Sequence, residues 1–143
     1  IYYFFFYFIM KILVFGTYDI FHKGHEYFLN ESAKLGSLNV VVARDLTTYE
    51  VKGMFPRHDQ LKRVKVLQEL PYVDNVFLGN EGDKYKIIEE IKPDVICLGY
   101  DQESFTKGLK EELEKRGLNV KINRIGSLKP EVYKSSVIRE KSR

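Results

Sequence analysis

Short apolar runs alternate with amphipathic stretches along most of this chain. The apolar runs are rich in Val, Ile and Leu and end at a glycine or a polar turn, a pattern typical of buried strands. Between them, apolar residues recur at intervals of three or four, and Gly or Pro follows the stretch, a pattern typical of helices. We therefore predict strands at 11–15, 38–43, 73–78, 94–98 and 118–125, and helices at 24–35, 59–70, 84–91, 104–116 and 135–141.

The predicted elements alternate between strand and helix, and the inner strands are apolar throughout. Such strands are typical of a parallel sheet that is covered on both faces and connected by right-handed crossovers. We predict an α/β fold, a single Rossmann-like doubly wound domain with a five-stranded parallel sheet, in which 118–125 forms an edge strand. Residues 44–57 show no clear period and contain Gly53 and Pro56, so we predict a loop there.

Residues 1–9 are all aromatic or Ile. They are too few to span a bilayer, and neither a preceding positive region nor a following cleavage site indicates a signal peptide. Met10 and Lys11 stand directly before a strand, as at a natural start. We expect 1–9 to be an apolar extension outside the fold and 10–143 to be the folded domain. The alternative is a membrane-surface anchor.

Composition fits one globular domain of 143 residues, with 44% hydrophobic and 30% charged residues. Lys and Arg (23) exceed Asp and Glu (20) only slightly, which does not favour nucleic acid over an anionic small molecule. We expect neither a nucleic-acid nor a membrane partner. The one cysteine, Cys97, lies in an apolar run and fits a small core residue in a reducing, cytoplasmic setting.

Residues 16–25 run from a predicted strand through a polar turn into a predicted helix, where backbone N–H groups favour anions. His22 and His25 are three residues apart and can face one ligand. Three interpretations stay open on spacing alone. Asp19 and both histidines could bind zinc, although the metalloprotease pattern needs a second histidine four residues on. The histidines could merely cap and pack, or they could donate hydrogen bonds to a transferring phosphoryl group.

Residues 16–19 (Gly-Thr-Tyr-Asp) and 22–25 (His-Lys-Gly-His) resemble the signature of the cytidylyltransferase-like nucleotidyltransferase superfamily. Residues 99–102 resemble the family's Gly-x-Asp loop, 134–138 resemble the motif that begins its last helix, and Arg63 stands where the family has an arginine before the third strand. The resemblance extends over about 10–140 and points to archaeal-type FAD synthetases and glycerol-3-phosphate cytidylyltransferases.

This resemblance implies that a substrate phosphate attacks the α-phosphorus of a nucleoside triphosphate, and that pyrophosphate leaves with Mg²⁺ bound. His22 and His25 would stabilise the transition state, and Lys52 would bind phosphate beside them. Arg63 and Lys129 would contact phosphate or the acceptor. The nucleotide-binding residues implied by the match are Phe15, Gly16, Thr17, Tyr18, Gly24, Gly99, Asp101, Gln102, Ser135 and Ser136.

The loop at 99–102 reads Gly-Tyr-Asp-Gln, similar to archaeal-type FAD synthetases, whereas the glycerol-3-phosphate enzymes have an acidic pair and Trp there. The chain contains no Trp, and Lys129 replaces the arginine of those enzymes. We therefore predict ATP as donor and FMN as acceptor. The alternatives are a CTP:glycerol-3-phosphate cytidylyltransferase and a non-catalytic nucleotide-binding regulator. By resemblance alone we also expect a homodimer.

Overall fold

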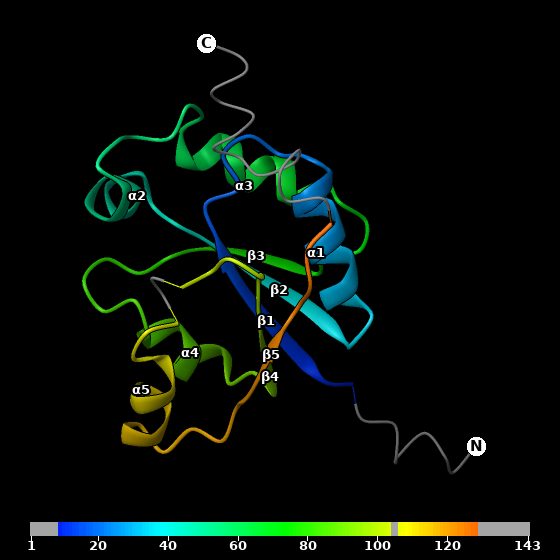
Figure 1. The fold of residues 1–143 in the computed structure, drawn as a ribbon, viewed down its shortest axis with the longest axis vertical. Coiled ribbons are helices and arrows are strands. Elements are labelled where there is room, and N and C mark those ends of the chain that lie inside the picture. The colour runs from blue at the N-terminus through cyan, green and yellow to red at the C-terminus, as the bar shows by residue number, and fades with distance from the viewer. Residues whose placement is uncertain (1–8, 104–105, 129–143) are drawn as a thin grey trace.

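The computed structural model describes residues 9–103 and 106–128, which form one sheet between two layers of helices (Figure 1). The strands are β1 (Lys11–Gly16), β2 (Ser37–Val42), β3 (Asn75–Leu78), β4 (Val95–Leu98) and β5 (Lys121–Arg124). The helices are α1 (Lys23–Ala33), α2 (Asp45–Lys52), α3 (Gln60–Gln68), α4 (Lys86–Ile91) and α5 (Leu109–Lys115). No helix in the described part of the chain is long and apolar enough to cross a membrane.

The five strands are parallel and lie in the order β3-β2-β1-β4-β5. The chain moves outward from β1 to β3 and then returns to the other side of β1 to form β4 and β5. This confirms the predicted five-stranded, doubly wound α/β fold, with β5 at an edge. The strand order reverses between β1 and β4, and ligands of such sheets bind at the carboxyl ends of the strands beside that point.

Alternate residues of β1 support two cores, as the two-residue period of a strand requires. Ile12 and Val14 belong to the core that includes Leu29 of α1 and Leu67 of α3. Leu13 belongs to the opposite core, with residues of α4 and α5. These side chains are fully buried or nearly so, and each contributes about 1.5–3 kcal/mol to folding by leaving water. The rigid two-sided packing of β1 fixes the position of the turn that follows it.

The prediction of a loop over 44–57 is wrong, because residues 45–52 form α2. This helix buries only Thr48, and Leu46 and Val51 are exposed, so no hydrophobic period marks it in the sequence. Gly53 ends it in the left-handed conformation, with φ of 78°. Tertiary contacts at its first turn, described below, compensate for the missing apolar face.

The helix predicted over 104–116 begins later, at Leu109. Gly108, directly before it, has a φ of 89°, and this left-handed conformation interrupts the helical backbone. Ser104, the expected N-cap, lies outside the described residues. So do residues 1–8, Lys129, Ser135, Ser136 and the predicted helix at 135–141.

Candidate active site

The turn after β1 is held by Asp19, whose side chain is nearly fully buried. Its two carboxylate oxygens accept hydrogen bonds from the backbone N–H groups of Arg57 and His58, each at 2.8 Å. Asp19 therefore joins the β1–α1 turn to the segment before α3. Asp19 thus has a structural role, which differs from the role as a zinc ligand that its spacing from the histidines had left open.

His22 is the N-cap of α1, and its Nδ1 accepts a hydrogen bond from the backbone N–H of Gly24 at 3.0 Å. Because Nδ1 is an acceptor, the neutral imidazole carries its proton on Nε2. The capping interpretation is therefore correct for one nitrogen of His22. The other nitrogen is a donor at the N-terminus of a helix, where an anion is favoured.

His25 stacks on His22, with 3.8 Å between ring centroids and 24° between ring planes. Burial, together with smaller effects of the neighbouring His22 and Lys52, lowers the pKa of His25 to about 3. Burial also lowers the pKa of His22, against an opposing effect of Asp101. Both imidazoles are therefore neutral at pH 7, so they can act as hydrogen-bond donors and not as cations.

Lys52, the last residue of α2, is brought to the turn after β1. Its Nζ donates to Thr17 Oγ1 at 3.4 Å. Desolvation and the Arg63 guanidinium lower the pKa of Lys52, while Asp101 raises it. A cation whose charge acts on His25 thus comes from an element that the sequence pattern did not reveal, although Lys52 itself was predicted to be a site residue.

Arg63 lies behind the site, with its side chain fully buried. Its Nη2 contacts Asp45 Oδ1 at 2.7 Å, its Nη1 donates to Thr17 O at 2.8 Å, and its Nε donates to His58 O at 3.0 Å. All three nitrogens face protein groups, which differs from the expected contact with phosphate or acceptor. In this arrangement Arg63 fixes the β1 turn and the start of α2 relative to each other.

Gln102 links the carboxyl ends of β1 and β4. Its Nε2 donates to Phe15 O at 2.9 Å, and its Oε1 accepts from the Gly99 N–H at 3.1 Å. Arg124 at the end of β5 donates to Gly99 O and Gln102 O and supports the same loop. Sequence reasoning missed Arg124, although the end of a strand at the ligand-binding edge of the sheet was a signal for it.

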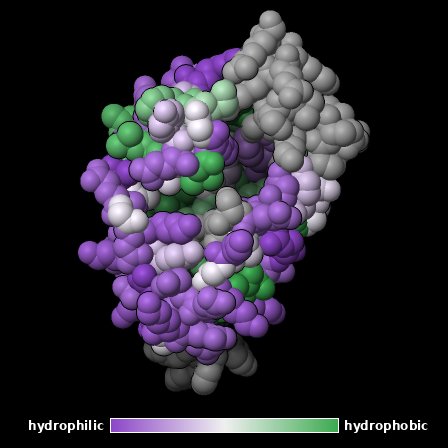
Figure 2. Space-filling view, turned by 60° about the vertical axis from the view of Figure 1, so that its left-hand side comes forward, coloured by the Kyte–Doolittle hydropathy of each residue, from purple (hydrophilic) through white to green (hydrophobic). Residues whose placement is uncertain are grey.

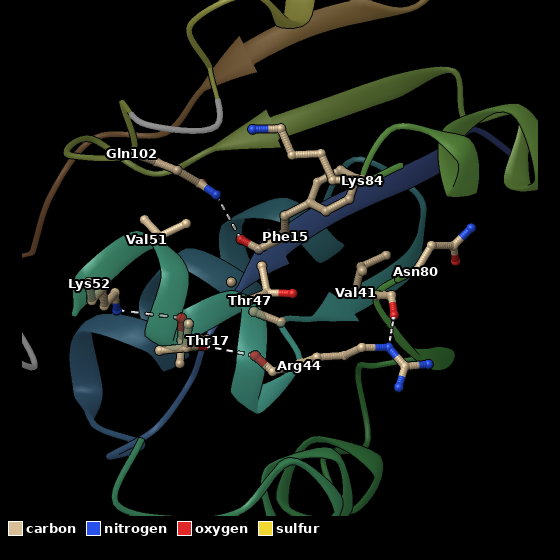
Figure 3. A pocket seen from close by; sticks show the side chains of 14 residues that line it. Phe15, Thr17, Val41, Arg44, Thr47, Val51, Lys52, Asn80, Lys84 and Gln102 are labelled. Carbon is tan, nitrogen blue, oxygen red and sulfur yellow. Dashed lines mark hydrogen bonds between the residues drawn. The ribbon is translucent and has the colours of Figure 1, made fainter. Parts of the chain in front are cut away.

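A pocket opens between the carboxyl ends of β1, β2 and β3 and the helix α2 (Figure 3). In Figure 3, Lys52 lies on one side and Asn80 on the other, with Phe15, Thr47 and Val41 between them. Figure 2 shows a hollow with hydrophobic residues in its depth and mainly hydrophilic residues around it. The pocket is lined by Phe15, Gly16, Thr17, Val41, Ala43, Arg44, Thr47, Thr48, Val51, Lys52, Gly79, Asn80, Lys84 and Gln102.

Five of the predicted site residues line this pocket: Phe15, Gly16, Thr17, Lys52 and Gln102. The others that line it come from 41–51 and 79–84, which contain no recognisable motif. Ala43 and Gly79 directly follow β2 and β3, so the rule that ligands bind at the carboxyl ends of strands was the available signal.

Asp101 is an exposed residue of the β4–α5 loop, and its charge acts on His22 and Lys52. Gly24 lies in the first turn of α1, between the two histidines. The structure therefore gathers the predicted residues of the β1 turn, α1, α2 and the β4 loop at one edge of the sheet. An arrangement of neutral donors, a nearby lysine and a helix N-terminus is suited to stabilising charge on a phosphoryl group.

Known proteins are similar to this chain in both sequence and fold. The cytidylyltransferase-like family model matches residues 13–141. A FAD synthase of Thermoplasma volcanium is 42% identical, covering 92% of this chain and 93% of that protein. A FAD synthase of Archaeoglobus profundus is 44% identical, covering 89% and 81%, respectively.

A solved structure from Thermoplasma volcanium, described as a lipopolysaccharide core biosynthesis protein, is 43% identical with a TM-score of 0.78, covering 84% of this chain and 98% of that one. A pantoate-β-alanine ligase of Francisella tularensis, at 16% identity and a TM-score of 0.62, covers 94% and 66% and shares the fold alone. By the family match and by the identity over nearly the whole chain, this protein belongs to the cytidylyltransferase-like family and is a nucleotidyltransferase.

Proposed function

We propose that this protein transfers AMP from ATP to FMN, forming FAD and pyrophosphate. The observation that carries the proposal is the pocket that opens beside the Lys52–Thr17 contact and is walled by Phe15, Val41 and Val51. An apolar pocket of this kind suits a flat aromatic ring far better than a small polar acceptor. The relatives named FAD synthase support the same assignment.

The reaction forms a bond between a phosphate oxygen of FMN and the α-phosphorus of ATP. It breaks the bond from that phosphorus to the oxygen bridging to the β-phosphate, and pyrophosphate leaves with the electron pair. The attacking phosphate oxygen is already deprotonated at pH 7, so no general base is needed. The protein therefore contributes positioning and stabilisation of charge.

In this proposal the Nε2–H of His22 and an N–H of His25 donate to oxygens of the α-phosphate as negative charge redistributes. Preorganised donors of this kind are typically worth about 10²–10³ in rate each. Lys52, next to Thr17, would neutralise phosphate charge where acceptor and donor meet.

The two substrates would occupy opposite sides of the β1 turn. The nucleotide would lie toward β4, with Gly99, Asp101 and Gln102 beside its ribose or base, and with its phosphates at Thr17, at Gly24 and at the backbone of Gly16 and Tyr18. The acceptor would lie toward β2 and β3, with its phosphate near Lys52 and its ring between Phe15 and Asn80. Binding of the β- and γ-phosphates by Ser135 and Ser136, and a contact from Lys129, stay predictions.

A divalent ion, Mg²⁺ in our proposal, would accompany the triphosphate. Among residues 9–103 and 106–128, no group of three or more His, Cys, Asp or Glu side chains could hold a metal ion. The ion would therefore be held mainly by triphosphate oxygens, where it would neutralise the leaving pyrophosphate. A cytoplasmic location and a homodimer also stay predictions; cell fractionation and sedimentation would test them.

Release of pyrophosphate over a grid of substrates tests the proposal. ATP and CTP are each combined with FMN, glycerol 3-phosphate, phosphocholine and riboflavin, with Mg²⁺ present. We expect turnover with ATP and FMN and none with riboflavin, which lacks the attacking phosphate. Turnover with CTP and glycerol 3-phosphate alone would overturn the assignment in favour of the cytidylyltransferase. Binding of ATP in a calorimeter without any turnover would indicate a regulator.

A further inference from the structure

Tyr18 belongs to the signature turn, yet its side chain is placed away from the pocket. The residue is only 5% exposed and belongs to the core beneath α1. Its φ is +54°, a left-handed conformation that non-glycine residues adopt rarely. Such a conformation persists where the surroundings enforce it, and it is frequent in functional turns.

The space for the Tyr18 ring is provided by Gly16. A Cβ atom at position 16 would lie 2.6 Å from two ring carbons of Tyr18 and 3.0 Å from its hydroxyl oxygen. No substrate is needed to explain a glycine here, because any side chain would displace the ring. Gly16 and Tyr18 thus form one packing unit at the end of β1.

The Tyr18 ring stands edge-on to the imidazole of His25, at 5.3 Å between centroids and 70° between planes. His25 in turn stacks on His22, and Phe21 flanks it at 5.6 Å. An edge-to-face contact restricts the rotation of both rings, because the positive edge of one ring is attracted to the negative face of the other. Contacts therefore run from Gly16 through Tyr18 to His25 and His22.

The contact with His25 is made by the ring of Tyr18. The hydroxyl oxygen is buried and has no hydrogen-bond partner among the described residues. Burial raises the pKa of Tyr18 far above its ordinary value, so the phenol stays neutral.

From this geometry we infer that Tyr18 is a positioning residue: its ring, admitted by Gly16, sets the orientation of the His25 imidazole toward the transferred phosphoryl group. The inference rests on the proposed role of His25 in nucleotidyl transfer. It assigns to the Tyr18 side chain and to Gly16 a packing task that is additional to the backbone contact with the nucleotide proposed above.

Three substitutions test the inference through kinetics. Tyr18→Phe keeps the ring and should retain kcat within twofold. Tyr18→Leu removes the ring and should lower kcat about tenfold, with the KM for ATP unchanged within twofold. Tyr72→Leu is the matched control, because Tyr72 packs against the same core and its hydroxyl also has no described partner. It should lower the thermal midpoint while leaving kcat unchanged.

Two further readouts do not depend on activity, so they separate failure of this inference from failure of the proposed function. The NMR signals of the His25 ring should shift in Tyr18→Leu and stay in place in Tyr18→Phe and Tyr72→Leu. Gly16→Ala should lower the thermal midpoint in the wild type, and by less than half as much when Tyr18 is already Leu.

Five results would overturn the inference. Three are kinetic: full kcat in Tyr18→Leu, equal loss in Tyr18→Phe, and equal loss in Tyr72→Leu. The other two are unchanged His25 ring signals in Tyr18→Leu and the same effect of Gly16→Ala in both backgrounds. Absence of turnover by the wild type with ATP and FMN would instead count against the proposed function, and the NMR and stability readouts would still decide this inference.

Discussion

The β4 side of the site is marked by short motifs in the sequence, whereas the β2–β3 side is formed by segments without a motif. On the β4 side, the Nδ1 of His22 accepts from Gly24 and Gln102 accepts from Gly99, although Gln102 also donates to Phe15 O, 87 residues away. On the other side, Arg44 Nε donates to Gly79 O, 35 residues away. The difference teaches that the groups proposed to stabilise the phosphoryl group can be encoded by a local motif, while the pocket proposed for the acceptor is assembled by the fold.

The largest expected effect lies in the motif. His22→Asn keeps a side chain that can cap α1 but removes the Nε2–H donor. We expect kcat to fall by about 10²–10³, the scale for losing one preorganised donor. Steady-state kinetics of pyrophosphate release measures this effect, and the thermal midpoint serves as control because the cap is retained.

A second substitution at the same position sharpens the comparison between the two sides. His22→Ala should lower kcat equally and also lower stability by about 1 kcal/mol, because it removes the cap as well. If His22→Asn had the same kcat as the wild type, His22 would serve only as the cap of the helix. The local motif would then encode structure and leave the chemistry to other groups.

Sequence reasoning predicted most of the β4 side because its signals are local. The strand ending at Gly16, the two histidines and the Gly99–Gln102 loop are each readable within a few residues. It failed for α2, whose exposed Leu46 and Val51 give no period. The pocket walls outside the motif residues were missed for the same reason, since Thr47 and Asn80 acquire their place only when β2, β3 and α2 assemble.

Arg63 joins the two sides, and its removal should cost the most stability. Arg63→Met leaves Asp45, Thr17 O and His58 O without the guanidinium that they contact. Removing one partner of a buried ion pair costs about 3–5 kcal/mol, and we expect about 3 because Asp45 is 30% exposed and can be hydrated. Denaturant unfolding measures this loss.

The exposed neighbour Lys62 provides the control for Arg63. Lys62→Met should change the free energy of unfolding by less than about 0.5 kcal/mol. Arg63→Lys should recover little, because an ammonium group cannot reproduce three donors in a planar arrangement. If Arg63→Met had the same free energy of unfolding as the wild type, the two sides of the site would be held together by other contacts.

The buried histidine predicts a pH dependence of stability. The pKa of His25 is about 3 in the folded protein and about 6.5 when unfolded, so the unfolded state binds the extra proton as the pH falls below 6.5. The stabilisation is complete above pH 6.5 and is lost at about 1.4 kcal/mol per pH unit on the way down toward pH 3.

Between pH 6.5 and 5 this loss amounts to about 2 kcal/mol. The measurement is the difference in unfolding free energy between the wild type and His25→Asn, which lacks the titrating group. That difference should change by this amount over the interval, while kcat of the wild type shows no step near pH 6.5 from His25. A constant difference would mean that water reaches His25 in the folded protein.

The smallest effect lies in the pocket, and it decides whether the two sides hold different substrates. Thr47 lines the pocket, so Thr47→Phe should obstruct an acceptor ring and raise the KM for FMN about tenfold, or about 1.4 kcal/mol. Leu46→Phe adds an aromatic ring to the same helix at a position that is 64% exposed, and it should leave both KM values unchanged. The KM for ATP should stay constant in both variants, because in the proposed arrangement the nucleotide would lie toward β4. If Thr47→Phe raised the KM for ATP instead, the pocket would hold the nucleotide, and the assignment of the two sides would be reversed.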